Sequence, residues 1–177
     1  EQSAQLGLRA LRNASAQHPV VVLFGRSYTL YDPILNIQIA RRLERLGLTA
    51  VPFDTILAAG IVPDELSHMQ WRIGTEHIQA AVAMRISPHA YPLFLSYYGC
   101  GPDAFIAKNL RQVMGERISL HVELDGHSGD AGLETRLEAF ADAIRSSSVS
   151  PSSFYLGKQT VSLRQPDRLK GRTIALP

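Results

Sequence analysis

Short, strand-like apolar runs alternate along this chain with longer stretches of helical character, and this alternation constrains the fold more than any other feature. The first run, at 20–24, reads VVVLF. A strand with one face in water alternates polar and apolar residues, so a run without polar positions predicts a strand buried on both faces. Further strand-like runs lie at 48–53, 93–97 and 118–124, and each leads through a loop into a helical stretch.

Repeated strand–loop–helix units predict the fold class. Right-handed crossovers between parallel strands place helices on both faces of one sheet. We therefore expect an α/β fold, a three-layer sandwich of flavodoxin-like or Rossmann-like type with at least four parallel strands. It should occupy residues 1–145. Residues 146–153 contain six serines in eight positions and are typical of a linker, and 154–177 would form a tail that adds an edge strand or begins a further domain.

Two of the expected helices have recognisable signals. Asp32 is followed by proline, an N-cap and first-turn pair that predicts a helix running to about Gly47, with Ile34 among its apolar positions. A second long helix is expected over 66–86, with Trp71 among its core positions.

Composition limits the classes of protein that need to be considered. The 177 residues are 45% hydrophobic, enough for one sizeable core, and 18 basic residues are mixed with 16 acidic ones. Without a concentrated basic surface we expect no nucleic-acid partner, and the apolar runs are shorter than the roughly 20 residues of a membrane span. We therefore expect a soluble domain. Because the first methionine is Met69, it should belong to a longer protein.

Cys100 is the only cysteine in the chain. One thiol cannot form an internal disulfide or a metal centre that needs several cysteines of this chain. The sequence therefore fits a reducing compartment, and we expect the protein to be cytoplasmic.

Three loops of unusual composition should converge. They lie at 25–32 (GRSYTLYD), 98–103 (YGCGPD) and 125–130 (DGHSGD), each after a predicted strand. Ligands of open α/β sheets bind beyond the carboxyl ends of the strands, where such loops meet.

The loop at 98–103 places Cys100 between Gly99 and Gly101, directly before a predicted helix. Unpaired N–H groups and the helix dipole at that position favour a thiolate, the form that ligates metals and attacks carbon. The flanking glycines allow a sharp turn and a close approach of ligand. Two plainer interpretations remain open: Cys100 as a small buried hydrophobic residue, and Asp103 as a first-turn acid that balances the dipole.

The loop at 125–130 is rich in acidic and imidazole groups. Glu123, Asp125 and His127 are spaced by two, so those in extended chain share one face and could bind a divalent metal or act as acid and base. Helix capping by Ser128 or Asp130 would account for the loop equally well.

The loop at 25–32 holds Arg26, which is suited to binding an anion. Tyr28 and Tyr31 add hydroxyl groups that either contact a ligand or fill space, and the dinucleotide fingerprint G-x-G-x-x-G is absent. The candidate site residues are thus of two kinds. Candidate catalytic residues are Cys100, Asp125 and His127, and candidate cofactor-binding residues are Arg26, Gly99, Gly101 and Asp103.

Four motifs in order along residues 20–145 point to a family. They are GRSYTLYDPILNIQIARRLERLG, MQWRIGTEHIQAA, LSYYGCGPDAFI and HVELDGHSGDAGLETRLEAF. Together they resemble the activase-related proteins of the 2-hydroxyacyl-CoA dehydratase and benzoyl-CoA reductase system, large bacterial and archaeal proteins often described as of unknown function.

The resemblance implies a domain of an ATP-dependent, low-potential electron-transfer protein with a [4Fe-4S] cluster. The cysteine of the CGPD motif, here Cys100, would be a cluster ligand. The remaining cysteines are not in this chain. Either other parts of the parent chain or a partner subunit supply them, or this domain holds no cluster by itself. Implied partners are other domains of the parent chain, including an ATP-binding activase domain, and an acyl-CoA or other small-molecule substrate.

Three functions therefore remain open. In the first, Cys100 ligates the cluster while Arg26, Asp125 and His127 line the cleft beside it. In the second, Cys100 is the nucleophile of a hydrolase or transferase, with His127 or His121 as its base. In the third, the domain is a non-catalytic docking or anion-binding module.

Overall fold

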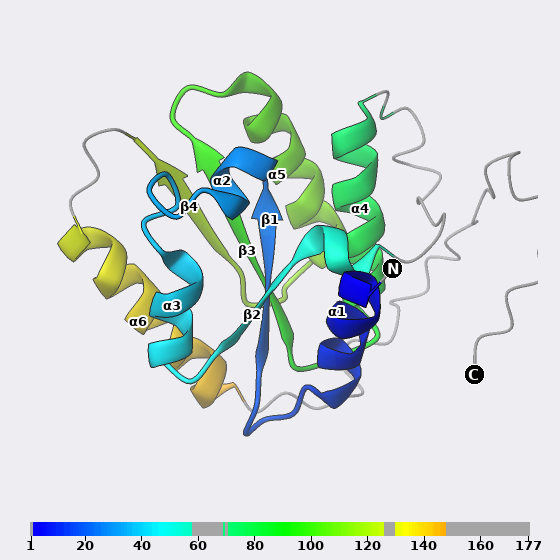
Figure 1. Cartoon of the computed structure of the whole chain (residues 1–177), viewed down its shortest axis with the longest axis vertical. Coiled ribbons are helices and arrows are strands. Elements are labelled where there is room, and N and C mark those ends of the chain that lie inside the picture. Colours follow the sequence, from blue (N-terminus) through cyan, green and yellow to red (C-terminus); the bar gives the residue numbers. More distant parts are fainter. Residues whose placement is uncertain (1, 58–68, 70, 126–129, 148–177) are drawn as a thin grey trace, which may run out of the picture.

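The computed structural model describes residues 2–57, 69, 71–125 and 130–147, and these form a three-layer α/β sandwich (Figure 1). Its central sheet has four strands, all parallel, in the order β2-β1-β3-β4. The strands are β1 (Val20–Gly25), β2 (Thr49–Pro52), β3 (Ala90–Tyr97) and β4 (Leu120–Leu124). The predicted fold class is confirmed.

Helices cover both faces of the sheet, as Figure 1 shows. One face carries α3 (Ile39–Arg45) and α6 (Asp130–Ser146), and the other carries α1 (Gln2–Asn13), α4 (Arg72–Met84) and α5 (Gly101–Met114). The chain moves from β1 to β2 in one direction, and from β2 to β3 and β4 in the other. Right-handed crossovers in opposite directions place their helices on opposite faces. The reversal makes the carboxyl ends of β1 and β3 a topological switch point.

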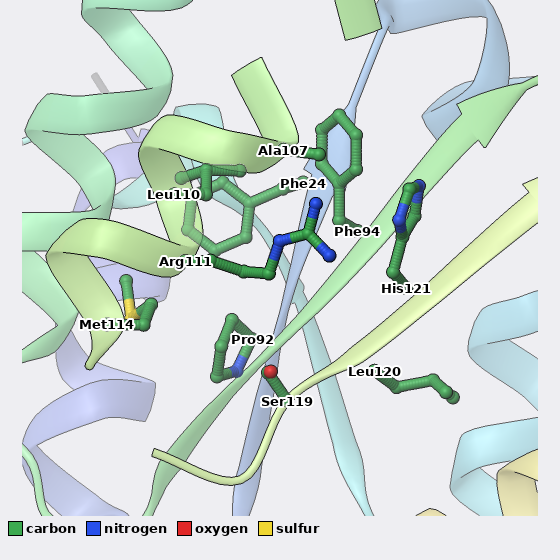
Figure 2. Close-up of a pocket in the computed structure, with 10 residues that line it drawn as sticks. All are labelled: Phe24, Pro92, Phe94, Ala107, Leu110, Arg111, Met114, Ser119, Leu120 and His121. Atoms are coloured by element: carbon green, nitrogen blue, oxygen red, sulfur yellow. The ribbon is translucent and has the colours of Figure 1, made fainter. Parts of the chain in front are cut away.

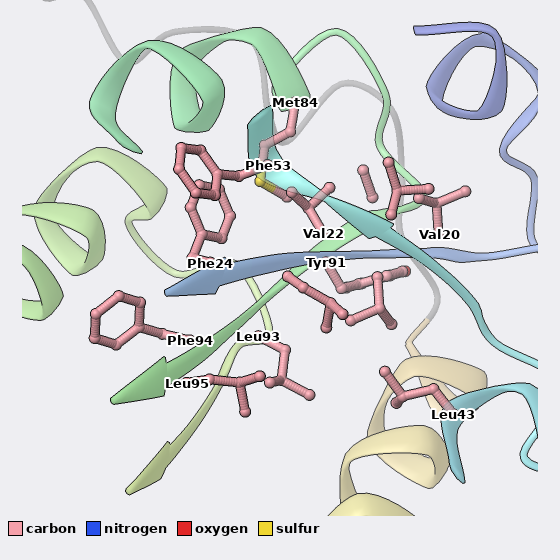
Figure 3. Packing of buried hydrophobic residues seen from close by; sticks show 14 of the residues in the cluster. Val20, Val22, Phe24, Leu43, Phe53, Met84, Tyr91, Leu93, Phe94 and Leu95 are labelled. Atoms are coloured by element: carbon pink, nitrogen blue, oxygen red, sulfur yellow. The ribbon is translucent and has the colours of Figure 1, made fainter. Parts of the chain in front are cut away.

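The core is built on the two central strands. All six positions of β1 are buried, as the apolar run predicted. Figure 3 shows Val22 and Phe24 pointing toward α4, whereas Leu93 and Leu95 point toward the opposite face. The ring of Phe24 stacks on that of Phe53 with centroids 5.9 Å apart. Burial of each such aromatic side chain contributes roughly 1.5–3 kcal/mol to folding.

The segment after β1 differs from the single helix that was predicted. A short helix, α2 (Ser27–Tyr31), comes first. The N-cap role predicted for Asp32 is wrong: its Oδ1 accepts the N–H of Ile34 at 2.8 Å, but this bond closes a turn, and the N-cap residue of α3 is Gln38. The chain then turns, and α3 begins only at Ile39 because Ile37 and Gln38 adopt left-handed φ angles of 52° and 53°. Ile34, which we expected among the apolar positions of that single helix, lies in the turn before α3 and is 86% exposed.

The second helix also differs. In the described part of the chain it begins at Arg72, and Trp71 is its N-cap residue. Trp71 is 47% exposed, so its assignment to the core is wrong. It packs edge-on against Phe105 of α5, with ring centroids 5.6 Å apart. The start predicted at 66 lies outside the described residues.

The end of the chain is described as far as residue 147, just past the end of α6. The tail predicted at 154–177 and most of the linker predicted at 146–153 lie outside the described residues and stay predictions. In the described ranges no helix combines the length and the apolar character needed to cross a membrane.

Three glycines provide a graded test of the backbone around the switch point. A Cβ at Gly25 (φ 155°) would lie 2.6 Å from the carbonyl oxygen of Leu95, whereas at Gly99 (φ 72°) and Gly101 it would meet nothing within 4 Å. Gly25→Ala should lower the free energy of unfolding by about 2–4 kcal/mol, through steric clash. Gly99→Ala should cost about 1 kcal/mol from its left-handed φ alone, and Gly101→Ala under about 0.5 kcal/mol. Urea unfolding measures all three, and equal losses would contradict the close approach of β1 and β3 at Gly25.

Candidate functional site

The loops that follow β1 and β3 meet at the switch point. Arg26 directly follows β1, and Asp103 lies in the first turn of α5. Arg26 Nε lies 2.8 Å from Asp103 Oδ1, so an ion pair joins two loops that are 77 positions apart in the sequence. The structure therefore brings together the regions 25–32 and 98–103, whose convergence the sequence predicted. We use the name switch-point crevice for the group formed by Arg26, Tyr28, Tyr97, Cys100 and Asp103 at this ion pair, after the place where open α/β sheets bind their ligands.

Asp103 is more than an acid that balances the helix dipole. Its side chain is 1% exposed, and its Oδ2 accepts the backbone N–H of Tyr97 at 3.3 Å. A carboxylate in such a place is stable only with a cation and hydrogen-bond donors around it. In return, the hydrogen bond that Arg26 donates to Asp103 raises the pKa of Arg26. Burial opposes this effect, and the charges of Asp103, Cys100 and Tyr28 add smaller contributions in the same direction as the hydrogen bond.

Cys100 is partly exposed, which distinguishes it from a cysteine that only fills the core. It occupies the N-cap position of α5, where its carbonyl accepts the N–H of Ala104 at 3.1 Å and its own N–H bonds to Tyr97 at 3.0 Å. The left-handed Gly99 makes this turn possible. The negative charge of a Cys100 thiolate contributes to raised pKa values at both Arg26 and Tyr28, so the three side chains share one electrostatic environment.

The two tyrosines of the first loop have different roles. Tyr28 is 46% exposed; partial burial, followed by the charges of Asp103 and Cys100, raises its pKa. Tyr31 donates its hydroxyl to both carboxylate oxygens of Asp54 at 2.6 Å. Tyr31 therefore ties α2 to the turn after β2, and Tyr28 is the tyrosine that faces the crevice residues.

The third loop is only partly described. Asp125 is exposed and engaged with other groups, while His127 lies outside the described residues, as do Ser128 and Gly129. The proposed role of His127 thus stays a prediction. Tyr98 donates its N–H to Leu124 at 2.8 Å, which holds the end of β4 beside the loop that carries Cys100.

His121 is not paired with the thiol. Its Nε2 lies 2.7 Å from Ser96 Oγ, and burial lowers its pKa. Its backbone carbonyl accepts a hydrogen bond from Arg136 of α6. No hydrogen bond joins an imidazole to Cys100 among the described residues, so a cysteine–histidine pair would depend on His127.

The donor set bears directly on the expected iron–sulfur cluster. Within 2–57, 69, 71–125 and 130–147, no three His, Cys, Asp or Glu residues gather as a metal site. A [4Fe-4S] cluster is generally held by four thiolates, and this chain has one cysteine. This chain can supply one of the four thiolate ligands, so it cannot hold a complete [4Fe-4S] cluster by itself.

An apolar cavity of about 40 Å³ lies between α5 and the strands β3 and β4 (Figure 2). Phe94 and Leu110 are among its walls, and Arg111 and His121 lie beside it. A water needs about 10–15 Å³ by the same kind of measure, and a benzene-sized cavity is about 150 Å³. The cavity is therefore too small for an acyl chain with its carrier.

Sequence reasoning missed one residue beside the crevice, His77 of α4. It is buried; its Nε2 lies 3.1 Å from the backbone nitrogen of Gly25, and its Nδ1 lies 2.6 Å from the carbonyl oxygen of Ile73. Burial lowers its pKa to about 4, against weaker opposing effects of the hydrogen bond to the Ile73 carbonyl and of the negative charge of Asp103. The only signal in the sequence is a histidine among the apolar positions of a helix.

Comparison with known proteins adds no assignment. No family model matches the chain, and a search of curated proteins finds no similar sequence.

The Arg26–Asp103 ion pair can be tested with a double-mutant cycle. Because Asp103 is buried and the Arg26 side chain only 27% exposed, Arg26→Gln and Asp103→Asn should show a coupling of about 1–2 kcal/mol in the free energy of unfolding. Arg72 and Glu76 lie 3.6 Å apart on α4 with the Arg72 side chain 90% exposed, and they provide the matched control with an expected coupling below about 0.5 kcal/mol. Equal couplings would contradict a special role of the Arg26–Asp103 pair.

The buried His77 should make stability depend on pH. Its pKa is about 4 in the folded protein and about 6.5 in the unfolded chain, so the unfolded chain takes up the proton first as the pH falls. This contribution to stability is complete above about pH 7 and decreases from about pH 6.5 to 4, by roughly 3 kcal/mol at pH 4. The free energy of unfolding in urea is measured against pH for wild type and for His77→Gln. The difference between the two profiles isolates the contribution of His77 from that of the carboxylates, which both proteins share. Parallel pH profiles for the two proteins would show that His77 is not the cause.

Proposed function

We propose that this chain is a component of an ATP-dependent, low-potential electron-transfer system related to the 2-hydroxyacyl-CoA dehydratase and benzoyl-CoA reductase proteins, to which Cys100 contributes one thiolate ligand of a [4Fe-4S] cluster. One observation carries the proposal. Cys100 is partly exposed at the start of α5 beside Arg26, at the topological switch point where open α/β sheets bind their ligands. The four motifs support the same assignment.

Several features around Cys100 suit a negatively charged metal centre. The N-terminus of α5 directs N–H groups and a partial positive charge toward it, and Arg26 adds a full charge. Open space lies over Gly99 and Gly101, where a Cβ would meet nothing within 4 Å, so a bulky group can approach the backbone. When bound, the cluster would supply one-electron transfer at low potential.

The remaining three ligands must come from outside these 177 residues, because Cys100 is the only cysteine here. Other domains of the parent chain, or a partner subunit that includes the activase, are the proposed source. The protein would then work in the reducing cytoplasm, where several free thiolates persist.

Arg26 is the proposed contact for an anionic group of the substrate, an acyl-CoA or another small molecule. Its Nε is occupied by Asp103. In the part of the chain that the structure describes, no other side chain hydrogen-bonds its terminal nitrogens, and its side chain remains 27% exposed. Asp103 thus orients the guanidinium while leaving its outer edge available.

A second candidate function is a docking or anion-binding module without chemistry of its own. Exposed aromatic side chains near the carboxyl edge of the sheet favour it, and they are Tyr28, Trp71, Tyr97, Tyr98 and Phe105. Aromatic residues are enriched at the centres of protein interfaces. Calorimetry with acyl-CoA, nucleotides and the partner domains separates the two candidates when it is combined with the iron measurement below.

The cluster proposal is tested by removing the thiol. The intact protein, with the parent domains or partners it has in the cell, is purified anaerobically as wild type, Cys100→Ala and the neighbouring control Tyr98→Phe. Iron, acid-labile sulfide and the EPR spectrum after reduction are then measured. Loss of one of four ligands should lower iron content or convert the cluster in Cys100→Ala, while Tyr98→Phe matches wild type. Iron content and EPR spectrum unchanged in Cys100→Ala would reject the ligand assignment.

A further inference from the structure

His77 lies beneath the switch-point crevice with both ring nitrogens committed. The carbonyl of Ile73 can only accept a hydrogen bond, so Nδ1 at 2.6 Å must carry the proton. The N–H of Gly25 can only donate, so Nε2 at 3.1 Å must present its lone pair. These two partners define a neutral imidazole in one tautomer.

Aromatic rings hold the imidazole in place. The Phe53 ring centroid lies 4.0 Å from that of His77, and the Phe24 and Phe94 rings lie at 5.9 and 6.1 Å. His77 is 1% exposed, so water cannot replace it as the acceptor for Gly25. The lowered pKa keeps this acceptor available at neutral pH. Two charged groups near His77, Arg26 and Asp103, act on its pKa. The other charged groups on neighbouring elements are Arg72 and Glu76 on the same helix and Asp54 on the turn after β2.

Gly25 links this contact to the crevice. It is the last residue of β1, and no side chain fits there because a Cβ would lie 2.6 Å from the Leu95 carbonyl oxygen. The next residue is Arg26, whose own carbonyl accepts the Thr29 hydroxyl at 2.8 Å and the Leu30 N–H at 2.9 Å. The backbone is thus fixed by His77 at Gly25 and by α2 at Arg26.

We propose that His77 is a positioning residue for Arg26: by accepting the Gly25 amide it fixes the backbone from which Arg26 reaches Asp103 beside Cys100. The inference rests on the proposed function only in treating this crevice as the working site. It assigns His77 no contact with substrate or cluster. Its effect passes through one buried hydrogen bond to the residue that precedes Arg26.

Three variants test this assignment by NMR of the present chain. His77→Phe keeps an aromatic ring but removes the acceptor. His77→Gln retains an acceptor oxygen near the position of Nε2, and Ile78→Val is the control for a small core loss on the same helix, since Ile78 is fully buried. The readouts are the Gly25 amide and the Arg26 Nε–H, which is bonded to Asp103.

Exchange of the Arg26 Nε–H with solvent should accelerate about tenfold or more in His77→Phe, because a buried donor without an acceptor loosens the backbone before Arg26. It should return toward the wild-type rate in His77→Gln and stay unchanged in Ile78→Val. A wild-type rate in folded His77→Phe, or equal acceleration in Ile78→Val, would overturn the assignment.

A pH titration keeps the test decisive if His77→Phe does not fold. In the wild type the Gly25 amide shift and the Arg26 Nε–H signal should change together, with one midpoint near the His77 pKa of about 4. In His77→Gln both changes should be absent. If the Arg26 Nε–H signal stays constant while the Gly25 amide shift changes, His77 does not position Arg26. No cluster is needed for these measurements, so they can fail or succeed independently of the Cys100→Ala experiment.

Discussion

The carboxylate of Asp103 is the group on which the crevice depends. Because this carboxylate is removed from water, it needs a cation and a hydrogen-bond donor. Arg26, in the loop after β1, is the cation, and the backbone N–H of Tyr97, at the end of β3, is the donor. The ion pair therefore fastens the start of α5 to a loop that is distant in sequence. Cys100 lies three residues before Asp103, so its position relative to Arg26 follows from the same contact. Without Asp103, no ion pair would join the two loops.

A second buried contact reinforces the first from below. His77 holds the amide of Gly25, and Gly25 lets β1 approach β3 closely enough for the loops to meet. Both contacts use a polar group inside an apolar core, where an unsatisfied partner is costly and a satisfied one specifies a single arrangement. The core thus supplies rigidity, and its few buried polar groups determine where the exposed thiol and guanidinium are placed.

Much of this arrangement can be predicted from the sequence. The buried strand at 20–24 and its alternation with helices are local signals, and they lead to the parallel sheet and to loops that meet at its carboxyl edge. The meeting of Arg26 with the region 98–103 follows from that topology. Other features depend on tertiary contacts. Trp71 is exposed, although its apolar side chain and the helical periodicity place it in the core. No pattern in the neighbouring sequence identifies His77 as the hydrogen-bond acceptor for the Gly25 amide.

The turn before α3 is a further feature that the sequence does not predict. A proline after Asp32 predicts a helix start, yet Asn36 donates its side-chain amide to the Leu30 carbonyl at 2.8 Å, and Arg42 donates to the Ile37 carbonyl at 2.8 Å. These contacts stabilise left-handed residues that intrinsic preference disfavours.

The central claim is that Cys100 binds iron. It is tested most directly by electron–nuclear double resonance on the reduced, fully assembled protein, with cysteine labelled with carbon-13 at Cβ. The account predicts carbon-13 hyperfine couplings from four cysteine ligands in the wild type, one of which disappears in Cys100→Ser while the other three remain. Identical carbon-13 spectra from the two proteins, with the cluster signal intact in both, would contradict it.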